Sequence, residues 1–191
     1  MQKKGRLIVV SAPSGCGKGT ILSRVLEDKE RFYYSVSCTT RAPREGEIDG
    51  VHYRFMSREA FERELAADAF LEHASYCDNY YGTLNAPIDE HLAAGQDVIL
   101  EIEVQGGMQI REKRPDATLV FIVPPSLEVL RERLLKRGTE TPEVVEKRVA
   151  QASRELAYVD QYDYCIVNDD LDAAIADMFS VIRAAELRIG R

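Results

Sequence analysis

Residues 7–20 read LIVVSAPSGCGKGT, and this stretch decides how the chain begins to fold. The apolar, β-branched run Leu7–Val10 predicts a buried strand, and the apolar positions of residues 21–26 have helical spacing directly after the loop. Gly15 and Gly17 allow successive backbone N–H groups to turn inward at a helix N-terminus, where they can hold an anion. The stretch therefore predicts a strand, a glycine-rich loop and a helix that together bind phosphate.

Lys18 directly follows the second glycine and adds positive charge where the β- and γ-phosphates of a nucleotide lie. The chain departs from the pattern G-x-x-x-x-G-K-[ST] at two positions, because Ala12 replaces the first Gly and Gly19 replaces the Ser or Thr. Thr20 is the nearest hydroxyl, so a metal bound with the nucleotide is expected to contact Thr20 directly or through water. A Gly/Ser loop after a strand is often an ordinary turn, but the lysine and the following helix favour phosphate binding.

The composition indicates a globular domain and excludes several classes of protein. The chain has 191 residues, of which 45% are hydrophobic, and this suits one large domain with a buried core. We find no apolar run near the ~20 residues of a membrane span and no secretory leader. The net charge of −7 argues against a nucleic-acid-binding surface. Cys16, Cys38, Cys77 and Cys165 lack metal-ligand spacing and suit reduced thiols in the cytoplasm.

Alternating strand and helix patterns predict an α/β core with a parallel sheet, which binds ligands at the carboxyl ends of its strands. The segments expected as strands are Leu7–Val10, Tyr33–Cys38, Val98–Ile102, Leu119–Val123 and Tyr164–Val167. The expected helices are Ile21–Lys29, Ala86–Ala94, Gln105–Lys113, Leu127–Lys136, Pro142–Tyr158 and Leu171–Leu187. Ser126 and Thr141 have the positions of helix N-caps.

Residues 41–83 interrupt this alternation. They contain short alternating segments at 51–55 and 70–74 around one predicted helix, Arg58–Leu65. We therefore expect a small mixed α/β insert that is carried on the core.

The insert begins with Arg41 and Arg44 in a loop that contains Pro and Gly. Two such guanidinium groups can clamp a phosphate, although an isolated pair is commonly a solvated surface. Near a phosphate-binding loop, the pair favours a second phosphate-bearing substrate. Glu72 can read the edge of a base and the tyrosines of 79–83 can donate to phosphate, with strand-edge solvation and core packing as the alternatives.

The chain resembles the guanylate kinases over essentially its whole length. The segments that carry the resemblance, in the order of the family, are SAPSGCGKGT, SVSCTTRAPREGEIDGVHY, FLEH, NYYGT, ILEIEVQG, FIVPPS, RGTET and IVNDD. The resemblance implies the α/β fold of a P-loop nucleoside-monophosphate kinase, with a parallel five-stranded core sheet flanked by helices. It implies one domain over 5–187, with a core of 5–40 and 84–187, a GMP-binding insert of 41–83 and a lid of 137–148.

The resemblance also implies where two nucleotides bind. The ATP-binding residues that it implies are Ala12, Pro13, Ser14, Gly15, Cys16, Gly17, Lys18, Gly19, Thr20 and Asn168. The GMP-binding residues that it implies are Ser37, Arg41, Arg44, Tyr53, Glu72, Tyr81, Thr83 and Glu103. Of these, Ser37 and Glu72 are expected to read the guanine base. The arginines and tyrosines are expected to hold the phosphate of GMP. Asn168 matches the position beside the adenine.

Two carboxylates differ from the residue that is common in the family. Many members have Asp at the positions of Glu101 and Glu103, where this chain keeps the charge on a longer side chain. The resemblance implies that Glu101 organises Mg²⁺ together with Thr20, directly or through water, and that Glu103 contacts the guanine amino group. For Glu101 the alternative is a solvated acid at a strand end.

The expected reaction is phosphoryl transfer from ATP, with Mg²⁺, to GMP or dGMP. Such a transfer needs positioning and charge neutralisation more than covalent help. The residues expected to neutralise the transferring group are Lys18, Arg41, Arg44, Arg137 and Arg148. The alternatives are a catalytically silent guanylate-kinase-like binding module, or another P-loop kinase for nucleotides or sugar phosphates. We expect a cytoplasmic monomer or homo-oligomer, with neither nucleic acid nor a membrane as partner.

Cys16 is an unusual residue within a phosphate-binding loop. Helix N-termini and a nearby lysine lower the pKa of a thiol, so one hypothesis is that Cys16 is more reactive than the other cysteines. The alternative is a small residue that fills space.

Overall fold

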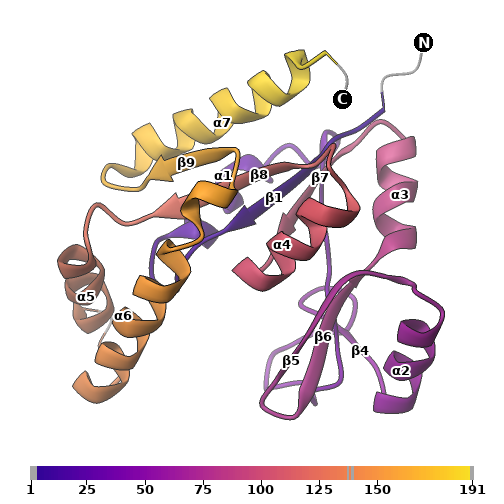
Figure 1. Cartoon of the computed structure of the whole chain (residues 1–191), viewed down its shortest axis with the longest axis horizontal. Coiled ribbons are helices and arrows are strands. Elements are labelled where there is room, and N and C mark those ends of the chain that lie inside the picture. Colours follow the sequence, from indigo (N-terminus) through magenta and orange to yellow (C-terminus); the bar gives the residue numbers. More distant parts are fainter. Residues whose placement is uncertain (1–3, 137, 139, 190–191) are drawn as a thin grey trace.

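A five-stranded parallel sheet forms the centre of the molecule, in the order β2-β7-β1-β8-β9 (Figure 1). The computed structural model describes residues 4–136, 138 and 140–189. The strands of this sheet are β1 (Leu7–Ser11), β2 (Phe32–Tyr34), β7 (Asp97–Glu101), β8 (Thr118–Val123) and β9 (Tyr164–Val167). The helices around it are α1 (Lys18–Val25), α3 (Asn85–Ala93), α4 (Val104–Lys113), α5 (Leu127–Lys136), α6 (Pro142–Leu156) and α7 (Leu171–Leu187), with the short 3-10 helix η1 (Val159–Gln161) before β9. The predicted α/β fold is confirmed.

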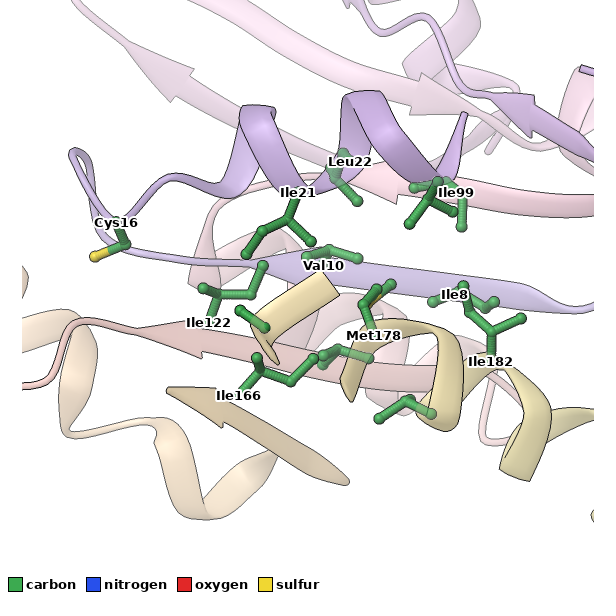
Figure 2. Close-up of a cluster of buried hydrophobic side chains, with 14 of the residues drawn as sticks. Ile8, Val10, Cys16, Ile21, Leu22, Ile99, Ile122, Ile166, Met178 and Ile182 are labelled. Atoms are coloured by element: carbon green, nitrogen blue, oxygen red, sulfur yellow. The ribbon is translucent and has the colours of Figure 1, made fainter. Parts of the chain in front are cut away.

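Strand β1 is buried on both faces, as its continuous apolar sequence requires. Successive side chains of a strand point to opposite faces of the sheet, so Ile8 and Val10 join one hydrophobic cluster and Leu7 and Val9 join another. The first cluster contains residues of α1, α5, α6 and α7, and Figure 2 shows side chains of α1 and α7 meeting over the sheet. The second cluster contains residues of α3 and α4.

The register of the sheet brings two functional segments together. Val10 of β1 pairs with Glu101 of β7, so the carboxyl end of β7 lies beside the start of the glycine-rich loop. This is the edge at which parallel α/β sheets bind their ligands.

A second sheet of four strands lies apart from the first, in the order β4-β3-β6-β5 (Figure 1). Its strands are β3 (Cys38–Thr39), β4 (Arg54–Phe55), β5 (Phe70–Tyr76) and β6 (Asn79–Leu84). Helix α2 (Arg58–Ala66) begins after Ser57, whose Oγ accepts a hydrogen bond from the N–H of Ala60. The rings of Phe61 and Phe70 stack with centroids 4.2 Å apart and give this smaller sheet a core of its own.

Several predicted element boundaries are corrected by the structure. The expected strand Tyr33–Cys38 is wrong in its second half, because β2 ends at Tyr34 and Cys38 pairs with Gly82 and Arg54 in the smaller sheet. Helix α1 begins at Lys18 and ends at Val25, earlier at both ends than expected. Ser126 is confirmed as a cap, since its Oγ accepts a hydrogen bond from the N–H of Val129 at 3.2 Å.

No helix within residues 4–136, 138 and 140–189 is long and apolar enough to cross a membrane.

Candidate active site

The glycine-rich loop between β1 and α1 depends on two left-handed residues. Gly15 has φ of 96° and Gly17 has φ of 80°, a region that strongly favours glycine. A Cβ atom on Gly17 would lie 2.4 Å from Nδ2 of Asn168, so the loop also needs glycine there for space. Gly17 is the residue before α1, whose first N–H groups have no carbonyl partners within the helix and can hold an anion.

Lys18, the first residue of α1, is directed to the end of β7. Its Nζ lies 3.3 Å from Oε1 of Glu101, and the hydroxyl of Tyr34 donates to Oε2 of the same carboxylate at 2.8 Å. Burial, followed by the charge of Glu101, raises the pKa of Tyr34. Glu101 is therefore ion-paired and hydrogen-bonded while its side chain stays 29% exposed.

Cys16 is buried, which contradicts the premise of the reactive-thiol hypothesis. The residue is 1% exposed and belongs to the hydrophobic cluster that also contains residues of α5 and α6. Burial raises the pKa of the Cys16 thiol to about 12, and this outweighs the opposite effects of Arg133 and Lys18. Cys16 therefore fills space beneath the loop, which was the alternative interpretation.

Asn168, which directly follows the edge strand β9, hydrogen-bonds to the glycine-rich loop. Its buried side-chain amide donates to the backbone carbonyl of Cys16 at 2.7 Å, and the backbone carbonyl of Asn168 accepts from Nη1 of Arg133 at 2.8 Å. The sequence reasoning missed Arg133, because an arginine within a helix is commonly solvated.

Arg148 of α6 reaches the glycine-rich loop. Its Nη1 donates to Oγ of Ser14 at 2.9 Å, and its guanidinium also pairs with Glu140. Two of the expected substrate-binding residues are thus in contact. Arg137, the other arginine expected in this segment, lies outside the described residues.

The smaller sheet and the end of β7 enclose a cavity of about 290 Å³. The predicted site residues that line it are Ser37, Tyr53, Glu72, Tyr81, Glu101 and Glu103. Arg41, Arg44 and Thr83 are not among the lining residues, and Arg44 is exposed. The structure thus gathers most of the residues expected on this side around one cavity.

Glu72 is a buried carboxylate in this cavity. Its Oε1 accepts a hydrogen bond from Oγ1 of Thr83 at 2.7 Å, and Ser37 Oγ lies 3.5 Å from that hydroxyl. Burial raises the pKa of Glu72 despite the bond from Thr83. A Cβ atom on Gly106, in α4, would lie 2.8 Å from Glu72 Oε2, so the glycine leaves room for the carboxylate. Sequence reasoning missed this role of Gly106.

Arg41 is held by an acid that the sequence reasoning missed. Its Nη2 and Nη1 donate to Oε1 and Oε2 of Glu47 at 2.8 and 3.0 Å. The Arg44 backbone N–H donates to the same carboxylate at 2.7 Å. The Arg41 guanidinium also lies 5.5 Å from the ring centroid of Tyr53. The position of Glu47 three residues after Arg44 is the only signal of this pairing in the sequence.

The sheet order, the glycine-rich loop and the smaller sheet define the fold of a P-loop nucleoside-monophosphate kinase. A family model described as "Guanylate kinase" matches residues 4–185. The chain therefore belongs to the guanylate kinase family.

Members of this family are similar to the chain over nearly their whole length. The guanylate kinase of Latilactobacillus sakei subsp. sakei (strain 23K) is 50% identical over 192 aligned residues, covering 100% of this chain and 95% of the relative. That of Desulfitobacterium hafniense (strain Y51) is 47% identical over 190 residues, with the same coverage. The crystal structure of guanylate kinase from Anaplasma phagocytophilum is 32% identical with a TM-score of 0.77, covering 98% of this chain and 90% of that one.

Proposed function

We propose that this chain transfers the γ-phosphoryl group of ATP to GMP, with ADP and GDP as products and dGMP as a further acceptor. The observation that carries the proposal is the position of Glu101. This carboxylate lines the cavity of the smaller sheet and forms an ion pair with Lys18 of the glycine-rich loop. The two candidate phosphate sites therefore meet at one residue, as a direct transfer between two nucleotides requires.

The proposed ATP site is the glycine-rich loop, residues 12–20. The N-terminus of α1 and the charge of Lys18 attract the β- and γ-phosphates. Arg148, which contacts Ser14, adds positive charge over the loop, and Arg137 is proposed to act with it as part of a lid over 137–148. Asn168, which holds the Cys16 carbonyl, is proposed to lie beside the adenine.

The proposed GMP site is the cavity of the smaller sheet, within the insert 41–83. Guanine presents its N1–H and N2–H₂ donors side by side, and an ionised carboxylate only accepts, so Glu72 can take both hydrogen bonds. Thr83 orients Glu72 through its 2.7 Å hydrogen bond, while Ser37 is placed to donate to the guanine O6 and Glu103 to accept from the amino group. The residues proposed to hold the phosphate are Arg41, Arg44, Tyr53 and Tyr81.

We propose Mg²⁺ as the metal that accompanies ATP. The oxygen donors of Thr20 and Glu101 suit this hard cation, which keeps several waters and takes one or two carboxylates together with substrate phosphates. The described residues contain no cluster of three or more His, Cys, Asp or Glu side chains that could hold a metal. When bound, Mg²⁺ neutralises charge on the phosphates.

The reaction needs no general base from the protein. A nucleotide phosphate has its second pKa near ~6, by analogy with phosphorylated side chains, so the GMP oxygen is a nucleophile at neutral pH. Lys18, Arg41, Arg44 and Arg148 neutralise charge on the equatorial oxygens of the transferring group, and the proposed lid excludes water that would hydrolyse ATP. We further propose that the enzyme works in the cytoplasm on small-molecule substrates, as a monomer or homo-oligomer, without nucleic acid or membrane.

A coupled assay of ADP production tests this function. The assay compares GMP, dGMP, AMP, CMP and UMP as acceptors, with Mg²⁺ and with excess EDTA. We expect kcat/KM for GMP to exceed that for AMP by about 10³-fold or more, and EDTA to abolish turnover. Preference for another acceptor would indicate a different kinase of the same fold, and nucleotide binding without turnover would indicate a silent binding module.

A further inference from the structure

The guanidinium of Arg41 is held along one of its edges. Nη1 and Nη2 each donate to a different oxygen of Glu47, and Nη1 also donates to the carbonyl of Ala42 at 2.7 Å. The Arg41 and Glu47 side chains are only 16% and 18% exposed. This bidentate geometry, with little solvent access, distinguishes the pair from a loose surface ion pair.

Glu47 is itself fixed to the loop that carries the arginines. Its Oε2 accepts the backbone N–H of Arg44 at 2.7 Å, and its own N–H donates to the Arg44 carbonyl at 3.1 Å. The hydrogen bonds from Arg41, followed by the bond from Arg44, lower the pKa of Glu47 to about 2. The carboxylate therefore stays ionised at neutral pH and links Arg41 to a defined backbone turn.

Two aromatic rings also lie close to the guanidinium. Its carbon lies 5.5 Å from the ring centroid of Tyr53 and 5.8 Å from that of Phe55. A guanidinium carries five N–H groups, and the bonds to Glu47 and Ala42 come from Nη1 and Nη2. Nε and the second hydrogen of Nη2 form a separate fork. The hydrogen bonds to Glu47, and to a smaller extent the nearby Tyr81, which lines the cavity, raise the pKa of Arg41.

We propose that Glu47 is a positioning residue for the acceptor phosphate: it grips Arg41 by the Nη1–Nη2 edge and so presents the Nε–Nη2 fork to the phosphate. The inference rests on the proposed role of Arg41 in holding GMP. An arginine fixed before the ligand arrives loses less rotamer freedom on binding, and its planar fork matches two phosphate oxygens.

Equilibrium titration of GMP and of guanosine tests this role. The variants are Glu47→Gln, which keeps the shape and loses the charge, Glu47→Asp, which shortens the side chain, and Arg41→Met. Glu45→Gln, at an exposed glutamate in the same loop, is the matched control. Each Glu47 variant is also combined with Arg41→Met, and thermal midpoints are recorded for all proteins.

We expect Glu47→Gln to raise Kd for GMP about tenfold or more, and Glu47→Asp to raise it less. Kd for guanosine, which lacks the phosphate, should stay within about twofold, and Glu45→Gln should change neither constant. In the Arg41→Met background the Glu47 substitutions should have no further effect, because the residue acts through Arg41.

Three results for the Glu47 variants would overturn the inference. The first is an unchanged or lower Kd for GMP in both variants, and the second is an equal rise of Kd for guanosine. The third is a rise of Kd for GMP that is just as large when Arg41 is already replaced by Met. If Arg41→Met alone left GMP binding unchanged, the proposed clamp would fail and the role of Glu47 with it. If Arg41→Met weakened GMP binding while both Glu47 variants did not, only the role of Glu47 would fail.

Discussion

The glycine-rich loop and the smaller sheet each offer a place for a phosphate, but they are built in different ways. In the loop, backbone conformation sets the site: Gly15 and Gly17 are left-handed, and Cys16 between them is anchored in the core. In the smaller sheet, pairs of side chains set the site, with Arg41 on Glu47 and Glu72 under Thr83. The first kind of site depends on backbone conformation, whereas the second depends on which side chains pair with one another.

The largest effect is expected at the loop. Replacing Lys18 by Met keeps the length of the side chain and removes its charge, so kcat should fall by about 10³-fold or more. The thermal midpoint should change little, because the ion pair of Lys18 with Glu101 is partly exposed. Lys29→Met, at an exposed lysine beyond α1, is the control for loss of charge alone. Turnover above about a tenth of wild type in Lys18→Met would contradict the charge-neutralising role.

Substitution in the cavity should change selectivity more than turnover. Glu72→Ala removes the acceptor for the N1–H and N2–H₂ donors of guanine, so the ratio of kcat/KM for GMP over AMP should fall by about 10²-fold or more. Ser37→Ala should reduce the ratio less, because a hydroxyl can donate to guanine or accept from adenine. The coupled assay with both acceptors measures this ratio. An unchanged ratio in Glu72→Ala would mean that the base is read elsewhere, with Glu103 as the first candidate.

Two glycines of the loop should respond differently to the same substitution. Gly17→Ala forces a left-handed alanine, which costs about 1–3 kcal/mol, and its Cβ would meet Nδ2 of Asn168. Gly19→Ala has nothing within 4 Å of the new Cβ and lies in the first turn of α1, so stability should be unchanged or slightly higher. Urea denaturation of both variants measures the difference. An equal loss of stability in the two variants would show that the left-handed conformation of Gly17 is not what makes this position sensitive.

The smallest effect concerns thiol labelling. Because burial raises the pKa of Cys16 to about 12, its thiol should stay neutral and react slowly at pH 8. Cys77 and Cys165 are exposed and should be alkylated first. Mass-spectrometric mapping after limited treatment with iodoacetamide gives the order. Labelling of Cys16 as fast as Cys77 would show that the loop opens readily, contrary to a core-anchored structure.

The loop could be predicted from sequence because its determinants are local. The strand, the glycines and the helix follow one another within residues 7–26, and each has a recognisable pattern. Cys16 was the exception. Whether its thiol faces the anion site or the core depends on α5 and α6, which are more than 100 residues away in the chain.

The smaller sheet was predicted only in outline. Its existence followed from the broken alternation of residues 41–83, but Cys38 was assigned to the wrong strand because its partners, Gly82 and Arg54, lie outside its local sequence. The space that Gly106 leaves for Glu72 was missed for the same reason, whereas Glu47 is only six residues from Arg41 and was missed because the loop between them has no regular pattern. Sequence patterns identify chemical groups, but only the fold shows which groups are paired.

A crystal structure of the chain with GMP and ADP bound would test the central claim that the two phosphate sites have separate occupants. The account predicts ADP on the glycine-rich loop, with its β-phosphate at Lys18. It predicts GMP in the cavity, with guanine on Glu72 and its phosphate on Arg41 and Arg44. GMP bound on the loop, or a guanine that does not contact Glu72, would contradict the account.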